Sequence, residues 1–105
     1  MPPYRTLDNL EEDYFRRHPQ EIEPYLQEIF EAFAEDGDSG ALLASLRTIA
    51  RVKGISTLAD EVGMSRQGLQ KALSAKGNPR LDNINSIMQA LGYYLAPQKR
   101  NVAAR

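Results

Sequence analysis

Apolar residues recur at intervals of three and four along most of the chain, the spacing that gathers side chains on one face of an α-helix. One stripe lies between residues 24 and 35, a second between 42 and 50, and a third between 81 and 91. Their members are Tyr25, Leu26, Ile29, Phe30 and Phe33; then Leu42, Leu43, Leu46, Ile49 and Ala50; then Leu81, Ile84, Ile87, Met88 and Leu91. The period-two alternation of a half-buried strand is almost absent, so the sequence predicts an all-α protein.

Proline, glycine and capping residues predict where these helices begin and end. Pro19 suits the first position of a helix, but Pro24 would remove an internal hydrogen bond. We therefore expect either a kink at Pro24 or a separate short turn before it. Gly37 is expected to cap the first striped helix in a left-handed conformation, and Asp38 or Ser39 to cap the start of the next. Further helix ends are expected at Gly54, Gly63 and Gly92.

Residues 56–73 have the capping and turn residues expected of a helix-turn-helix. Ser56 or Thr57 can cap a short helix that runs to Val62, and Ser65 can cap a second that runs to Leu73. A turn is expected at Gly77-Asn78-Pro79. A helix-turn-helix needs a small residue where the helices touch, a glycine in the turn and an apolar residue behind the second helix. These roles fit Ala59, Gly63 and Leu69.

The second helix of this unit leaves polar residues on its outer face: Ser65, Arg66, Gln67, Gln70 and Lys71. Arginine can grip guanine with two hydrogen bonds, glutamine can pair with adenine, and a serine at a helix start can hold a phosphate. Lys76, Asn78 and Arg80 follow in the next loop. These eight residues are our predicted DNA-binding set. The alternative is a small helical bundle with an ordinary polar face.

Charge is divided unevenly along the chain. Residues 1–38 contain eleven acidic and three basic residues, a net charge of −8, whereas residues 39–105 contain three acidic and ten basic residues, a net charge of +7. Such asymmetry suits a chain in which one half faces a polyanion and the other a basic partner or solvent. The acidic half also carries Tyr14, Phe15, Tyr25 and Phe30. These aromatic residues fit either a core stripe or an interface with a basic protein.

The two ends of the chain give weaker signals. Residues 1–18 are expected to form a loosely structured acidic segment, residues 19–96 the helical DNA-binding domain, and residues 97–105 a frayed tail. Tyr93-Tyr94-Leu95 is aromatic and extended enough for a short strand or a docking arm.

Several functional classes are excluded by composition. The chain has no Cys and one His, so it cannot supply thiol chemistry, disulfides or a multi-histidine metal site. His18 is expected to be solvated beside Arg16 and Arg17, and the consecutive carboxylates at 11–13 diverge rather than converge on a metal. We therefore expect no enzyme, no metal and no cofactor. No apolar run approaches the roughly 18 residues of a membrane span, so a cytoplasmic protein is expected.

DNA reading by one short helix implies a symmetric dimer. A single recognition helix contacts only a few base pairs, so a usable operator needs two half-sites about 34 Å apart. We expect the contact between copies to use the last apolar surface of the chain: Ile87, Met88, Leu91, Tyr94 and Leu95. The alternative is that these residues fill the core of one copy.

The sequence also resembles a known family. The stretch Gly63 to Pro79, with Leu73-Ser74 and Gly77-Asn78-Pro79, is similar to the signature of HigA-type addiction-module antidotes with an XRE (Cro/C1-type) helix-turn-helix. The likeness extends over roughly residues 10–96. It implies a five-helix, lambda-repressor-like domain with an N-terminal helical extension and a short extended C-terminal segment.

The same resemblance implies a function. The chain is expected to be the antitoxin of a type II toxin-antitoxin module, which binds and neutralises a HigB/RelE-like ribonuclease toxin and represses its own operon. A stand-alone XRE-family repressor without a toxin partner is the alternative.

Overall fold

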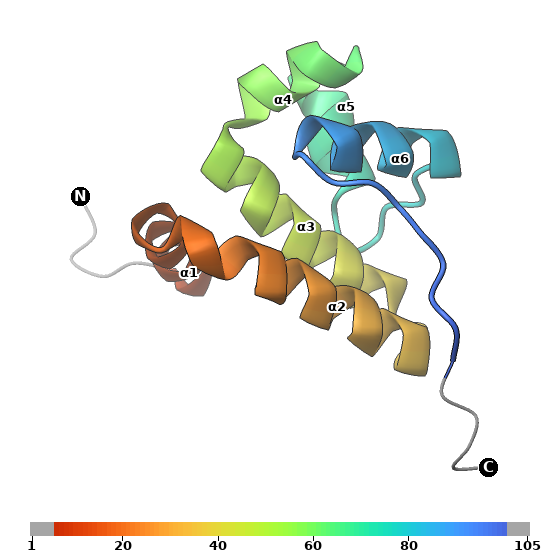
Figure 1. Ribbon diagram of the computed structural model, residues 1–105. Helices are drawn as coiled ribbons and strands as arrows, with labels where there is room; N and C mark the ends of the chain where they lie inside the picture. The colour runs from red at the N-terminus through yellow and green to blue at the C-terminus, as the bar shows by residue number, and fades with distance from the viewer. Residues whose placement is uncertain (1–5, 101–105) are drawn as a thin grey trace.

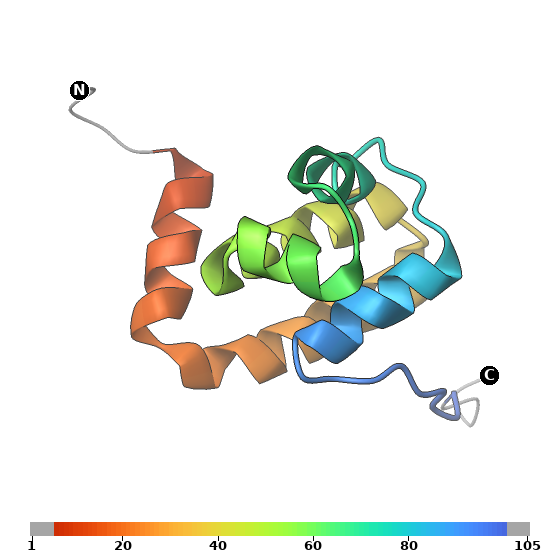
Figure 2. The same cartoon turned by 90° about the horizontal axis from the view of Figure 1, so that it is seen from above.

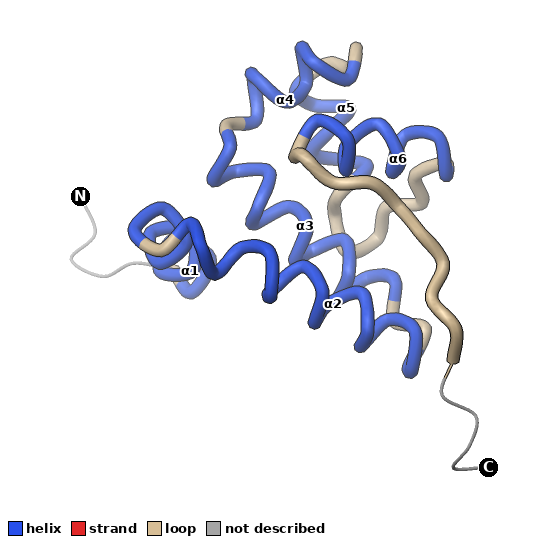
Figure 3. Tube along the Cα trace, viewed as in Figure 1, coloured by secondary structure: helices blue, strands red, loops and turns tan. Residues whose placement is uncertain are grey.

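The computed structural model describes residues 6–100, which fold into six α-helices and one short 3-10 helix (Figure 1). The helices are α1 (Leu7–Arg17), α2 (Ile22–Asp36), α3 (Ser39–Lys53), α4 (Ile55–Val62), α5 (Arg66–Ala72) and α6 (Leu81–Ala90), and the 3-10 helix η1 (Pro19–Glu21) precedes α2. Residues 6–100 contain no strand (Figure 3). The all-α prediction is therefore confirmed. The lambda-repressor-like five-helix arrangement stays a prediction.

Helix α3 lies at the centre of the fold. Helices α1 and α2 pack against it, α4 follows from its end, and α5 and α6 both pack on α4 (Figures 1 and 2). The largest fully buried side chains are Leu46, Leu58, Leu69, Leu73 and Ile87. They come from α3, α4, α5, the end of α5 and α6, so one apolar core joins the central helix to the two short helices.

The predicted boundaries around α3 and α5 are confirmed. Gly37 ends α2 with a φ of +68°, and the Asp38 side chain accepts a hydrogen bond from the backbone N–H of Ala41 at 3.0 Å. In the same way, Ser65 Oγ accepts the backbone N–H of Gly68 at 2.9 Å at the start of α5. Each cap satisfies an N–H that the first turn of a helix leaves without a partner.

Pro24 is accommodated without breaking a helix. The 3-10 turn at Pro19–Glu21 precedes α2, and Pro24 is the third residue of α2. A residue in the first turn has no intrahelical partner for its N–H, so proline loses nothing there. Of the two expected solutions, the separate short turn is correct.

Two local predictions between α3 and α6 are wrong. Helix α4 begins at Ile55 rather than after Ser56 or Thr57, because the carbonyl oxygen of Gly54 already accepts the N–H of Leu58 at 3.0 Å. The turn lies at 74–77 instead of 77–79, and the N–H of Gly77 donates to the carbonyl oxygen of Ser74 at 2.9 Å. A β-carbon at Gly77 would collide with the backbone of Ala72.

The N-terminal segment differs from the expectation of a loosely structured stretch. Residues 7–17 form α1, whose first turn is capped by Thr6 Oγ1, which accepts the N–H of Asn9 at 3.1 Å. Phe15 and Glu12 are buried against the rest of the fold. The helix forms because it places these two side chains on the face that meets α3. Residues 1–5 lie outside the described residues.

The C-terminal segment is not a strand. The N–H of Tyr93 donates to the carbonyl oxygen of Met88 at 2.8 Å, and residues 94–100 then continue as an extended loop past α2 (Figure 1). Tyr93 packs against the core. Part of the predicted frayed tail, residues 101–105, falls outside the described residues.

Candidate functional site

Helices α4 and α5 meet through a three-residue turn, Gly63 to Ser65. Gly63 ends α4 with a φ of +72°, a conformation that side chains with a β-carbon rarely adopt. Met64 is half-buried in the turn, and its N–H donates to the carbonyl oxygen of Ala59 at 2.9 Å. Leu69 in α5 and Leu73 at its end are fully buried beneath α5. This anchoring fixes which face of α5 is turned outward.

The predicted DNA-binding residues are all exposed. They are Ser65, Arg66, Gln67, Gln70, Lys71, Lys76, Asn78 and Arg80. A hollow of about 510 Å³ joins α5 to the loop that follows, and its walls include Lys71, Lys76, Asn78 and Arg80. The fold therefore brings three cationic side chains, which are up to nine residues apart in the sequence, to one depression.

Arg80 is only loosely held. Its Nε lies 3.5 Å from Asp82 Oδ1, and the side chains are 82% and 67% exposed. An ion pair so open to water contributes little to stability, so the guanidinium can turn toward another anion at small cost.

An ion-pair network holds α1 on α3. Arg51 Nη1 donates to Glu12 Oε2 at 3.2 Å and lies 3.9 Å from Asp8 Oδ2. Arg16 adds a contact of 3.6 Å to the other Glu12 oxygen, and its Nη2 donates to the carbonyl oxygen of Arg51 at 3.3 Å. Sequence reasoning missed this network, because nothing in the local pattern pairs residues that lie 39 positions apart.

The predicted toxin-binding aromatic residues divide into two groups. Phe15 is buried, with its ring centroid 4.7 Å from that of Tyr25. It belongs to the core, so the prediction that it contacts the toxin is corrected. Tyr25 and Phe30 are half-buried, whereas Tyr14 is 48% exposed. Tyr14 shares an outward stripe with Leu7 and Leu10, which are also exposed. Their spacing of three and four residues was the signal that could have found this stripe.

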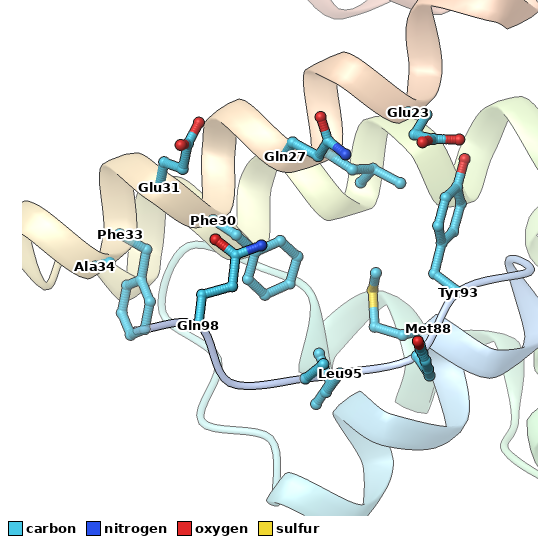
Figure 4. Close-up of a pocket in the computed structure, with 13 residues that line it drawn as sticks. Glu23, Gln27, Phe30, Glu31, Phe33, Ala34, Met88, Tyr93, Leu95 and Gln98 are labelled. Carbon is cyan, nitrogen blue, oxygen red and sulfur yellow. The ribbon is translucent and has the colours of Figure 1, made fainter. Parts of the chain in front are cut away.

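A groove separates α2 from the C-terminal segment (Figure 4). It has a volume of about 690 Å³, and Leu26, Phe30 and Met88 contribute apolar side chains to it. Glu23, Gln27 and Glu31 line it from α2, and residues 93–98 supply most of the opposite wall. Burial raises the pKa of the Tyr93 hydroxyl above its ordinary value of 10.0, and the negative charge of Glu23 raises it further.

Comparison with known proteins shows the family of this chain. The family described as "probable addiction module antidote protein" matches residues 7–99. This chain belongs to that family. A relative from Haemophilus influenzae (strain ATCC 51907 / DSM 11121 / KW20 / Rd), described as an uncharacterized protein, is 36% identical over 84 residues, which cover 80% of this chain and 82% of the relative. No solved structure matches the chain.

Membership has two consequences. An antidote of an addiction module acts against a toxin, so this antidote has a toxin partner of some kind. Membership of this family also indicates a regulatory protein rather than a catalytic one.

The predicted dimer residues of the antidote are only partly at its surface. Ile87 and Met88 lie in the core, 0% and 3% exposed, so the prediction that they form the dimer contact is corrected. They are buried because α6 packs this face on α4. Leu91 is half-buried, Leu95 is 37% exposed and Tyr94 is 72% exposed. Leu81, which sequence reasoning assigned to the core stripe, is 76% exposed.

Among residues 6–100, no group of three or more His, Asp or Glu side chains is placed to hold a metal ion. No helix in the same range is long and apolar enough to cross a membrane.

Proposed function

We propose that this antidote is the antitoxin of a type II module, which binds operator DNA through α5 and neutralises a HigB/RelE-like ribonuclease toxin through its acidic half. The observation that supports DNA binding best is the outward face of α5. Its polar side chains stand exposed over the buried Leu69 and Leu73, beside a hollow lined by Lys71, Lys76 and Arg80.

Each exposed residue has a role in this proposal. Arg66 and Gln67, in the first turn of α5, contact base edges, and Gln70 and Lys71 extend the contact by one turn. Ser65 contacts a phosphate: its Oγ accepts the N–H of Gly68, and its own hydrogen stays free to donate. In the following loop, Lys76, Asn78 and Arg80 contact backbone phosphates.

The toxin contact is assigned to the acidic half. Helix α2 contains five acidic residues and no basic one. A ribonuclease that binds a polyanion is expected to be basic, so opposite charge accelerates its capture. Tyr14, Tyr25 and Phe30 supply the aromatic contact area that charge alone lacks.

We further propose that the antidote acts in the cytoplasm as a homodimer. The two-fold contact uses the surface that α6 and the C-terminal segment leave open. It includes Leu91, Tyr94 and Leu95, which the sequence predicts, and Leu81 in addition. Such a dimer presents two copies of α5 to two half-sites.

The DNA proposal is tested by comparing Arg66→Ala and Lys76→Ala in binding to the antidote's own promoter and to random DNA. Arg66→Ala should lose on the order of 1–3 kcal/mol on the operator only, because it removes a base contact. Lys76→Ala should weaken binding to both DNAs about equally. It should also reduce the slope of log affinity against log salt concentration by about one. Equal losses on both DNAs for Arg66→Ala would reject its base-reading role.

The toxin proposal is tested by co-expressing the antidote with the small proteins encoded beside its gene. We expect one basic neighbour to co-purify with the antidote and to stop growth when produced alone. If no neighbour does so, the stand-alone repressor is the better description.

A further inference from the structure

The groove between α2 and the C-terminal segment is built unlike a small-molecule site. Its floor is apolar, and Leu26 and Met88 are buried there. Every buried side-chain nitrogen or oxygen among residues 6–100 has a hydrogen-bond partner. The floor of the groove therefore has no free buried polar group to orient a small ligand. A volume of about 690 Å³ is also enough for several side chains of another protein.

The rim of the groove is negative. Glu23 and Glu31 line it from α2, and none of the lining residues is Lys, Arg or His. Neither glutamate forms an ion pair with any residue in the range 6–100. A polyanion would be repelled here, whereas a basic side chain would meet two carboxylates that form no ion pair within residues 6–100.

The second wall can still form main-chain hydrogen bonds. The backbone groups of residues 94–98 take part in no hydrogen bond within the described chain, and the segment is extended. A partner segment that lies beside it can therefore pair with its backbone, except at Pro97, which has no N–H, while the partner's side chains enter the groove. Phe33, which is 36% exposed, leaves apolar area for such side chains to cover.

The position of the groove suits a partner that binds together with DNA. Figure 1 shows α2 and α5 on opposite sides of the molecule, with α3 and α6 between them. A protein seated between α2 and the C-terminal segment leaves the outward face of α5 uncovered.

We infer that this groove holds a basic, amphipathic segment of the toxin, with its apolar side chains over Phe30 and Phe33 and its basic side chains beside Glu23 and Glu31. This rests on the proposed antitoxin function and makes the site more specific. It narrows the main contact from the acidic half as a whole to a groove whose second wall lies some sixty residues further along the chain.

The test uses three full-length variants and the purified toxin of the same module. Glu31→Lys reverses the charge at the rim, and Glu28→Lys makes the same change on an exposed residue of α2 that does not line the groove. Leu10→Ser alters the outward stripe of α1. All three sites are exposed, so circular dichroism should show unchanged folding. Affinity is measured by calorimetry or biolayer interferometry at several salt concentrations.

We expect Glu31→Lys to weaken toxin binding at least about tenfold, and Glu28→Lys to change it by less than about threefold, because Glu31 lines the groove and Glu28 does not. If the two charge reversals act equally, or if Leu10→Ser alone abolishes binding, the groove is not the site although the antitoxin function stands. If the unmodified antidote does not bind the toxin, the proposed function itself fails.

The free antidote supplies a further check. Its mass is measured by sedimentation for the unmodified chain and for Glu31→Lys, and the two should agree. A loss of dimer in Glu31→Lys would show that the groove is covered by a second copy of the chain, which would overturn the inference.

Discussion

Replacing Arg51 by methionine should loosen the packing of α1 on α3 while the rest of the fold stays intact. Methionine keeps most of the apolar stem of Arg51 but removes the guanidinium that contacts Glu12 at 3.2 Å. The Glu12 side chain is only 9% exposed, so its carboxylate cannot be fully solvated after the loss.

The size of the effect follows from the exposure of the two partners. At 3.2 Å the gross attraction is about 5 kcal/mol for an effective dielectric constant near 20, but desolvation of both ions cancels much of it. Breaking a fully buried pair costs about 3–5 kcal/mol, and breaking an exposed one about 0–1 kcal/mol. Arg51 is 35% exposed, and Arg16 still lies 3.6 Å from Glu12. We therefore expect a loss of about 1–2 kcal/mol in unfolding free energy.

The measurement is urea unfolding followed by far-ultraviolet circular dichroism, for Arg51→Met, Glu12→Gln and the double variant. The coupling energy from this cycle should be about 1 kcal/mol, since the two residues share one interaction. Hydrogen exchange should accelerate in α1 and stay slow at Leu46 in the core of α3. Lys53→Met is the matched control: its pair with Glu61 at 3.3 Å is 32% and 44% exposed, so its loss should cost less than about 0.5 kcal/mol.

A coupling energy near zero, together with unchanged exchange in α1, would refute this reasoning. Phe15 alone would then account for the docking of α1, and the ion pairs would be incidental to it.

Two further predictions concern a backbone turn and a titrating side chain. Gly63→Ala should destabilise the antidote by about 1 kcal/mol in urea unfolding, because alanine resists the left-handed conformation although its β-carbon meets no other atom within 4 Å. In an alkaline ultraviolet titration, Tyr93 should ionise above the ordinary tyrosine pKa of 10.0, and Tyr93→Phe should remove this late step. Its pKa is raised in the folded state, so the unfolded chain releases the proton first, and stability should fall as pH rises above 10.0.

The sequence by itself determined the helices from α2 to α6, several of their ends and the antidote family. The periodic stripes gave α2, α3 and α6, and the caps at Asp38 and Ser65 formed as expected. Such features depend on residues within three or four positions of one another, so a linear pattern contains the information they need. The exposed face of α5 was predictable for the same reason, because Leu69 and Leu73 fix the opposite face.

Only the tertiary structure decided which apolar faces are covered. Phe15 and Ile87 have the chemistry of interface residues, yet both are buried, whereas Leu81 continues a core stripe and is 76% exposed. Helix α1 is ordered by contacts with α3, through a glutamate and an arginine 39 positions apart. The groove likewise exists only where residues 93–98 come to lie beside α2. Whether an apolar side chain becomes core or surface depends on which distant segment packs over it, and this is set by the packing of the whole chain rather than by its neighbours in sequence.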